Sequence, residues 1–191
     1  MFIGTDRPVY EKAVKLSQER NIVFLDRPVK KVVAYLDKEE FKTAWVGNKA
    51  IYRTRMAIAD GGKLVILAPG IRQFGENCEC DALIRKYGFI GRERVLNLLN
   101  TNDDLKKNQS ISAHLIHAST EGRFNVTYAL DKLEKEDMES VNFNYMPLSE
   151  AYDKYDPSLL CDGFNTMEDG EEIFFVKYPA LGLWVDRNRF I

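Results

Sequence analysis

The chain has 191 residues, of which 45% are hydrophobic and 29% charged, a composition typical of a globular protein with a sizeable core. Its formal net charge is -2, with basic and acidic residues mixed along the sequence, so no broad basic surface for nucleic acid is expected. No apolar run approaches the roughly 18 residues that a membrane span requires, and the first residues lack the apolar core of a signal peptide. These features predict a single cytoplasmic domain with no membrane or nucleic acid partner.

Cysteine usage indicates a reduced protein. The three cysteines, Cys78, Cys80 and Cys161, are an odd number, and two of them are only two positions apart, which disfavours a disulfide framework. A C-x-C pair can bind a soft metal, but no second pair follows at the spacing of a zinc site. We therefore expect no metal ligands in this chain and assign no role to these thiols.

The first elements are predicted to be a helix and two strands. A helix begins near Pro8 and runs to about Arg20, with Val9, Ala13 and Leu16 on its inner face. The run NIVFLD then indicates a buried strand, and a second strand is predicted at residues 32–37.

The stretch from Trp45 to Gly70 is predicted to organise the fold. Small or apolar side chains form one helical stripe in a helix from about residue 48 to residue 59. The Asp-Gly-Gly sequence at 60–62 is typical of a helix end, and the apolar run at 64–68 indicates a strand covered on both faces.

Strands and helices alternate through the rest of the chain. The pattern therefore predicts one α/β domain over residues 1–191, a three-layer sandwich with a mostly parallel mixed sheet of the Rossmann-like type. The remaining helices are expected at 80–87, 92–99, 104–119, 134–140 and 150–155, and the remaining strands at 123–130, 141–148 and 171–178.

The outer face of the helix at 48–59 is basic. Lys49 and Arg53 lie four residues apart, beside Asn48, Tyr52 and Arg55. Two like charges at this spacing repel each other slightly, so a bound anion would explain them, and a solvated basic surface is the alternative.

Two further positions are candidates for polar contacts. Arg72 follows the carboxyl end of the strand at 64–68, where α/β sheets gather ligands, although a plain surface loop has the same composition. His114 and His117 are three residues apart on a predicted helix and could face a metal or a substrate, or serve only in helix packing or capping. We assign no role to His114.

The run GNKAIYRTRMAIADGGKLVILAPG, with AHLIHASTEGRF and IFFVKYPALGLW, resembles the C-terminal domain of the nickel-dependent lactate racemase family. The likeness is greatest to a branch labelled as uncharacterised or as mannonate oxidoreductase. It implies that Lys49 is the active-site lysine that helps hold the substrate carboxylate. Trp45 and Val46 replace a tyrosine and a glutamine of the family, so lactate itself is not assigned as the substrate.

The resemblance also implies a nickel-pincer nucleotide for the full enzyme. In the family this cofactor belongs to an N-terminal catalytic domain, and no part of this sequence resembles that domain. We therefore expect a partner that supplies it, in the same chain or in another subunit. No cofactor is expected on this chain alone, which should be inactive by itself.

Three functions remain open. The first is racemisation or epimerisation of a small 2-hydroxy acid, with a sugar acid as one option, by hydride transfer. For this first function, Lys49 is expected to be catalytic, and the expected substrate-binding residues are Asn48, Arg53, Arg72 and His117. The second is a non-catalytic binding or assembly module. The third, a nicotinamide-dependent mannonate oxidoreductase, is disfavoured because the G-x-G-x-x-G fingerprint is missing.

Overall fold

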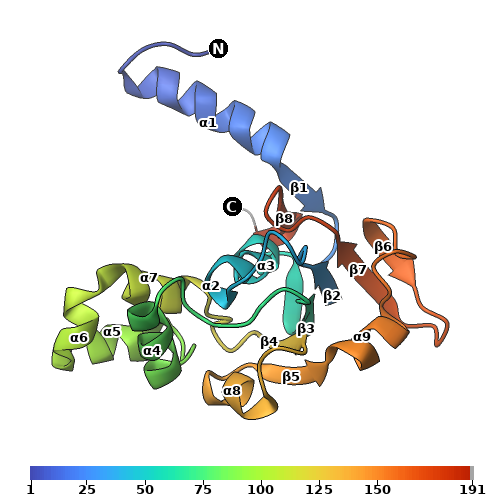
Figure 1. Ribbon diagram of the computed structural model, residues 1–191. Helices are drawn as coiled ribbons and strands as arrows, with labels where there is room; N and C mark the ends of the chain where they lie inside the picture. The colour runs from blue at the N-terminus through green and yellow to red at the C-terminus, as the bar shows by residue number, and fades with distance from the viewer. Residues whose placement is uncertain (190–191) are drawn as a thin grey trace.

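A mostly parallel sheet forms the centre of the molecule. The computed structural model, shown in Figure 1, describes residues 1–189, and within them six strands pair in the order β5-β4-β3-β2-β7-β6. All neighbouring strands run parallel except β6 and β7. The predicted Rossmann-like α/β sandwich is therefore confirmed. The strands are β2 (Val29–Tyr35), β3 (Ile58–Leu67), β4 (Phe124–Leu130), β5 (Asn144–Pro147), β6 (Gly163–Thr166) and β7 (Glu172–Val176).

Both faces of the central strands are covered. On β3, Leu64 and Ile66 belong to the larger apolar cluster, whereas Val65 and Leu67 belong to a second cluster on the opposite face with α9 (Leu148–Lys154). The apolar run at 64–68 predicted a strand that is covered on both faces. In such a strand every side chain is buried, so apolar residues occupy consecutive positions.

Several short helices cover the side of the larger cluster. They are α2 (Ala44–Gly47), α3 (Lys49–Thr54), α4 (Cys78–Tyr87), α5 (Arg92–Thr101), α6 (Asp103–Lys107), α7 (Gln109–His117) and α8 (Lys135–Ser140). The single helix predicted over 104–119 is wrong, because the chain leaves the helical conformation at Asn108. The Asn108 side chain donates to the carbonyl of Asp104, a local bond of the kind that ends helices. None of the described helices is long and apolar enough to cross a membrane.

The helix predicted over 48–59 is also shorter than expected. It ends at Thr54, and β3 already begins at Ile58, so the Asp-Gly-Gly sequence lies inside the strand and does not cap the helix. Gly61 has a φ of 73°, and the register between β2 and β3 shifts at this point. A glycine accommodates such a bulge because it has no Cβ.

An arm made of α1 (Arg7–Asn21) and β1 (Ile22–Leu25) extends from the body, as Figure 1 shows in blue. Strand β1 pairs in parallel with β8 (Leu183–Asp186) in a separate small sheet. Helix α1 has no buried residue, so the expectation of an inner apolar face is wrong. The strand predicted at 21–26 exists, but it is buried only at Leu25, because it lies outside the main sheet.

Candidate functional site

The candidate site begins at the junction between α2 and α3. The hydroxyl of Thr43 caps α2 by accepting from the backbone N–H of Val46 at 3.3 Å. Asn48 separates the two helices, and its carbonyl accepts from the backbone N–H groups of Ile51 and Tyr52. Lys49 is therefore held at the first position of a new helix.

The Asn48 side chain is completely buried and bonded at both ends. Its Oδ1 accepts from the Tyr128 hydroxyl at 2.7 Å, and its Nδ2 lies 3.0 Å from Nε2 of His114. Because an amide nitrogen only donates, Nε2 of His114 must accept, which assigns the proton of the neutral ring to Nδ1. Burial, followed by the charge of His117, lowers the pKa of His114 to about 4, so this ring is neutral at physiological pH. The Trp45 ring stacks on it at 3.9 Å between centroids.

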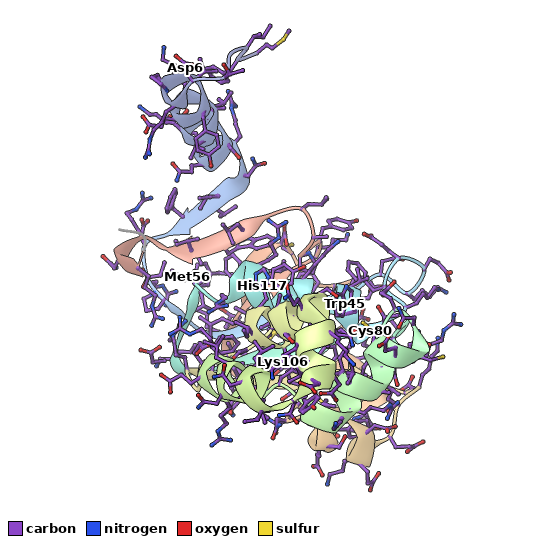
Figure 2. All side chains as sticks on the ribbon, turned by 90° about the vertical axis from the view of Figure 1, so that its left-hand side faces the viewer. Asp6, Trp45, Met56, Cys80, Lys106 and His117 are labelled. Atoms are coloured by element: carbon purple, nitrogen blue, oxygen red, sulfur yellow. The ribbon has the colours of Figure 1, made fainter. Side chains whose placement is uncertain are left out.

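Basic side chains of α3 and its C-cap lie near the end of α7, and we define Lys49, Arg53, Arg55 and His117 as the basic cluster; within it, Arg53 and Arg55 interact electrostatically with His117. The His117 ring stacks on Tyr52 at 4.3 Å, and Nη1 of Arg55 donates to the His117 carbonyl at 3.3 Å. Partial burial and then the charges of Arg55 and Arg53 lower the pKa of His117. In Figure 2 the labels of His117 and Trp45 lie on the body of the molecule, below the arm.

The cluster contains cations without acidic partners. Among the ion pairs of residues 1–189, none includes Lys49, Arg53 or Arg55. By contrast, Arg123 is bonded to Asp60 and to the carbonyls of Arg55 and Ile58. The basic face predicted from the sequence therefore exists, and no carboxylate of the described chain neutralises it.

Arg53 and Arg72 have different surroundings. Arg53 lines a cleft of about 490 Å³ between α3, the arm and the start of β8, and its Nε is buried without a hydrogen-bond partner. Arg72 is exposed after β3, and its backbone N–H donates to the carbonyl of Lys42. No contact recorded for the described residues joins Arg72 to the basic cluster, so the structure does not bring these candidates together.

The described residues do not fit a nickel centre. No group of three or more His, Cys, Asp or Glu side chains in residues 1–189 could hold a metal ion. The Nε2 of His114 is engaged by Asn48, and the three cysteines are free thiols, of which Cys80 has a pKa raised by burial. The described residues therefore include no cluster that could hold a metal ion by side-chain ligands alone.

Tyr128, which bonds to the Asn48 amide from β4, was not among the residues predicted from the sequence. The one available signal was a tyrosine within the apolar run of a predicted strand, because a buried phenol hydroxyl needs a hydrogen-bond partner. That signal does not identify a partner 80 positions away in the chain.

Neither a protein-family model nor a curated protein sequence matches the chain. Several solved structures share its fold, among them the following two. A protein from Thermotoga maritima has a TM-score of 0.69 and 25% identity, with 93% of this chain covered. The lactate racemase apoprotein from Thermoanaerobacterium thermosaccharolyticum has a TM-score of 0.60 and 14% identity, with 95% covered. The chain spans 41% of the length of each, and it has a lactate-racemase-like fold.

Proposed function

We propose that the chain is the substrate-closing part of a lactate-racemase-like enzyme that racemises or epimerises a 2-hydroxy acid, and that its basic cluster binds the substrate carboxylate. The observation that supports this proposal is the basic face of α3, which has no acidic partner in the described chain, on a fold shared with a lactate racemase apoprotein. An anionic substrate would supply the missing negative charge.

Lys49 is the proposed primary contact. Its ammonium is a compact point charge, so it fixes a carboxylate oxygen but does not set the orientation of the whole carboxylate plane. A second donor is therefore needed, and the Tyr52 hydroxyl or a neighbouring guanidinium meets this need from the same helix face. Pinning the carboxylate orients the Cα–H bond, and orientation is the main catalytic contribution that such a surface makes.

Asn48 and His117 have distinct proposed roles. Asn48 acts as a positioning residue, because its bonded amide holds the start of α3 and with it Lys49. Partial burial and then the charges of Arg55 and Arg53 lower the pKa of His117, which favours the neutral ring and leaves one ring nitrogen to accept a hydrogen bond from the substrate hydroxyl. Arg72 is expected to contribute least, since it lies apart from the cluster.

The redox chemistry is assigned to another domain. Since the described residues form no metal site, we propose that the nickel-pincer nucleotide of the full enzyme is carried by an N-terminal domain, in the same chain or in a partner subunit. This chain then binds and orients the substrate, and it is inactive alone.

The test mixes this chain with the cofactor-loaded N-terminal half of a lactate-racemase-like enzyme and follows a panel of 2-hydroxy acids by chiral chromatography. Activity should appear only on mixing. Lys49→Ala should lower kcat/KM by about tenfold to a hundredfold, the value of one charge-assisted contact. Lys63→Ala is the matched control, because Lys63 is an exposed lysine in the middle of β3 without an ion pair among the described residues and should leave activity unchanged.

The contrary outcomes separate the alternatives. If the two halves bind each other but no 2-hydroxy acid is converted, or if Lys49→Ala has no effect, the enzymatic proposal fails and a binding or assembly module replaces it. Saturable binding of NADH to the chain would instead support the nicotinamide-dependent oxidoreductase.

A further inference from the structure

The cleft at Arg53 is separate from the position of Lys49. Its lining is formed by the end of α1, the start of β1, Arg53 itself and the turn that enters β8, and it does not include Lys49 or His117. We infer that this cleft is a second anion subsite, and that the substrate carries a second anionic group in addition to the carboxylate beside its hydroxyl. This inference rests on the proposed function for the position of the first carboxylate.

The lining of the cleft suits a polar ligand. Helix α1 contributes Ser17, Gln18 and Asn21, while β8 and the turn before it contribute apolar surface through Leu181 and Leu183. Asn21 donates from Nδ2 to the hydroxyl and the carbonyl of Ser17, which leaves its Oδ1 without a recorded partner. The Gln18 amide has no side-chain partner among the described residues either, and its NH2 group is the donor that the arm offers to an anion, since the free Asn21 Oδ1 only accepts.

The Arg53 guanidinium has no hydrogen-bond acceptor among the described residues. Its Nε is buried without a hydrogen bond, and neither Nη nitrogen has a recorded partner among the described residues. A buried donor without a partner is unfavourable, and the cost is larger for a charged group. Nε and one Nη nitrogen together form the edge that binds a carboxylate or phosphate with two parallel hydrogen bonds. An oxyanion in the cleft meets the accessible Nη nitrogens first and reaches Nε when the side chain rotates.

The spacing on α3 defines the ligand. Lys49 and Arg53 are four residues apart, which places their Cβ atoms about 6 Å apart on one helix face. Because both side chains are long and flexible beyond Cβ, their charged ends can reach two anionic groups of one short ligand. The geometry therefore fits a short 2-hydroxy acid with a distal carboxylate or phosphate better than a monocarboxylate.

The test measures binding to this chain by calorimetry and by NMR chemical shifts, independently of activity. The probes are lactate, with one anionic group, malate, with a second carboxylate, and 3-phosphoglycerate, with a phosphate. At least one of the two doubly anionic probes should bind about tenfold or more tightly than lactate, because one additional charge-assisted pair contributes about that factor. The affinities of malate and 3-phosphoglycerate, compared with each other, show whether the distal group is a carboxylate or a phosphate. Arg53→Gln should abolish that preference, while Arg20→Gln, an exposed arginine at the end of the same arm, should preserve it.

Each outcome has a distinct meaning. If Arg53→Gln weakens lactate and malate by the same factor, Arg53 shares a single carboxylate with Lys49, so the subsite is overturned and the proposed function stands. The subsite is equally overturned if malate and 3-phosphoglycerate bind no better than lactate. If Lys49→Gln leaves lactate binding unchanged while Arg53→Gln still removes the preference for two charges, the proposed function fails and the subsite stands.

Discussion

The side-chain amide of Asn48 bonds to Nε2 of His114 at 3.0 Å, and this contact joins two residues 66 positions apart. The Tyr128 hydroxyl, from a third element, completes the network at the other end of the amide. One buried asparagine therefore ties α3 to α7 and to β4. The position of Lys49 depends on this network, because the next residue in the chain is part of the same turn.

Replacing Asn48 with alanine should strongly destabilise the fold. The change leaves the Tyr128 hydroxyl and the His114 ring buried without their shared partner, and each such loss costs about 1–3 kcal/mol. The free energy of unfolding, measured by urea denaturation, should therefore fall by roughly 2–6 kcal/mol. Asn125→Ala, at an exposed position on β4, is the matched control and should change stability by no more than about 0.5 kcal/mol. Equal losses in the two variants would contradict the network.

His114 should make the protein less stable in mild acid. Its pKa is about 4 in the folded chain, against about 6.5 when unfolded, so the unfolded state binds more protons between these values. Stability that is present above about pH 6.5 is therefore lost progressively as the pH falls towards 4, by about 3 kcal/mol in total. The measurement is a series of denaturation curves between pH 4 and pH 8.

Two variants isolate this contribution. In His114→Gln the amide oxygen still accepts from Asn48 but does not titrate, so the fall in stability between pH 6.5 and pH 4 should shrink by most of its size. His117→Gln should have a smaller effect in the same direction, since the pKa of His117 is also lowered but its side chain is exposed. Identical pH profiles for the wild type and His114→Gln would show that His114 is not the titrating group.

Arg53 and Arg55 should respond oppositely to replacement by methionine. Arg53→Met removes a buried Nε that has no partner and keeps the apolar stem, so the free chain should become more stable, by about 1 kcal/mol. Arg55→Met removes the donor to the His117 carbonyl and should lose about 0.5–1.5 kcal/mol. Thermal unfolding of both variants, without added anions, measures the difference. Destabilisation by Arg53→Met would mean that the guanidinium is already satisfied in the free chain.

The parts of the fold that were predictable are those recorded in local pattern. The apolar run at 64–68 indicated a strand covered on both faces, and Leu64, Val65 and Ile66 do alternate between two apolar clusters. The basic face of α3 was also visible, because a four-residue spacing places Lys49 and Arg53 on one side of any helix. Such patterns depend only on the periodicity of the backbone.

Other features depended on contacts between distant segments. The Asp-Gly-Gly sequence was expected to end a helix, but it forms a bulge in β3, where Gly61 donates its N–H to the carbonyl of Arg123. Glycine allows both conformations, so only the neighbouring strand decides between them. Helix α1 has an amphipathic pattern and still has no buried residue, because its position on the arm leaves no surface to pack against.

The sequence by itself determined the α/β class, the main strands and a helix face that carries two cations. Only the tertiary structure decided how the candidate residues are grouped. It joined Asn48 to His114 and Tyr128, brought His117 to Tyr52, left Arg72 apart, and placed Arg53 in a cleft of its own. The physical reason is that local propensity and periodicity act over one or two turns of chain, whereas burial and hydrogen-bond satisfaction are decided by segments that meet only in the folded protein.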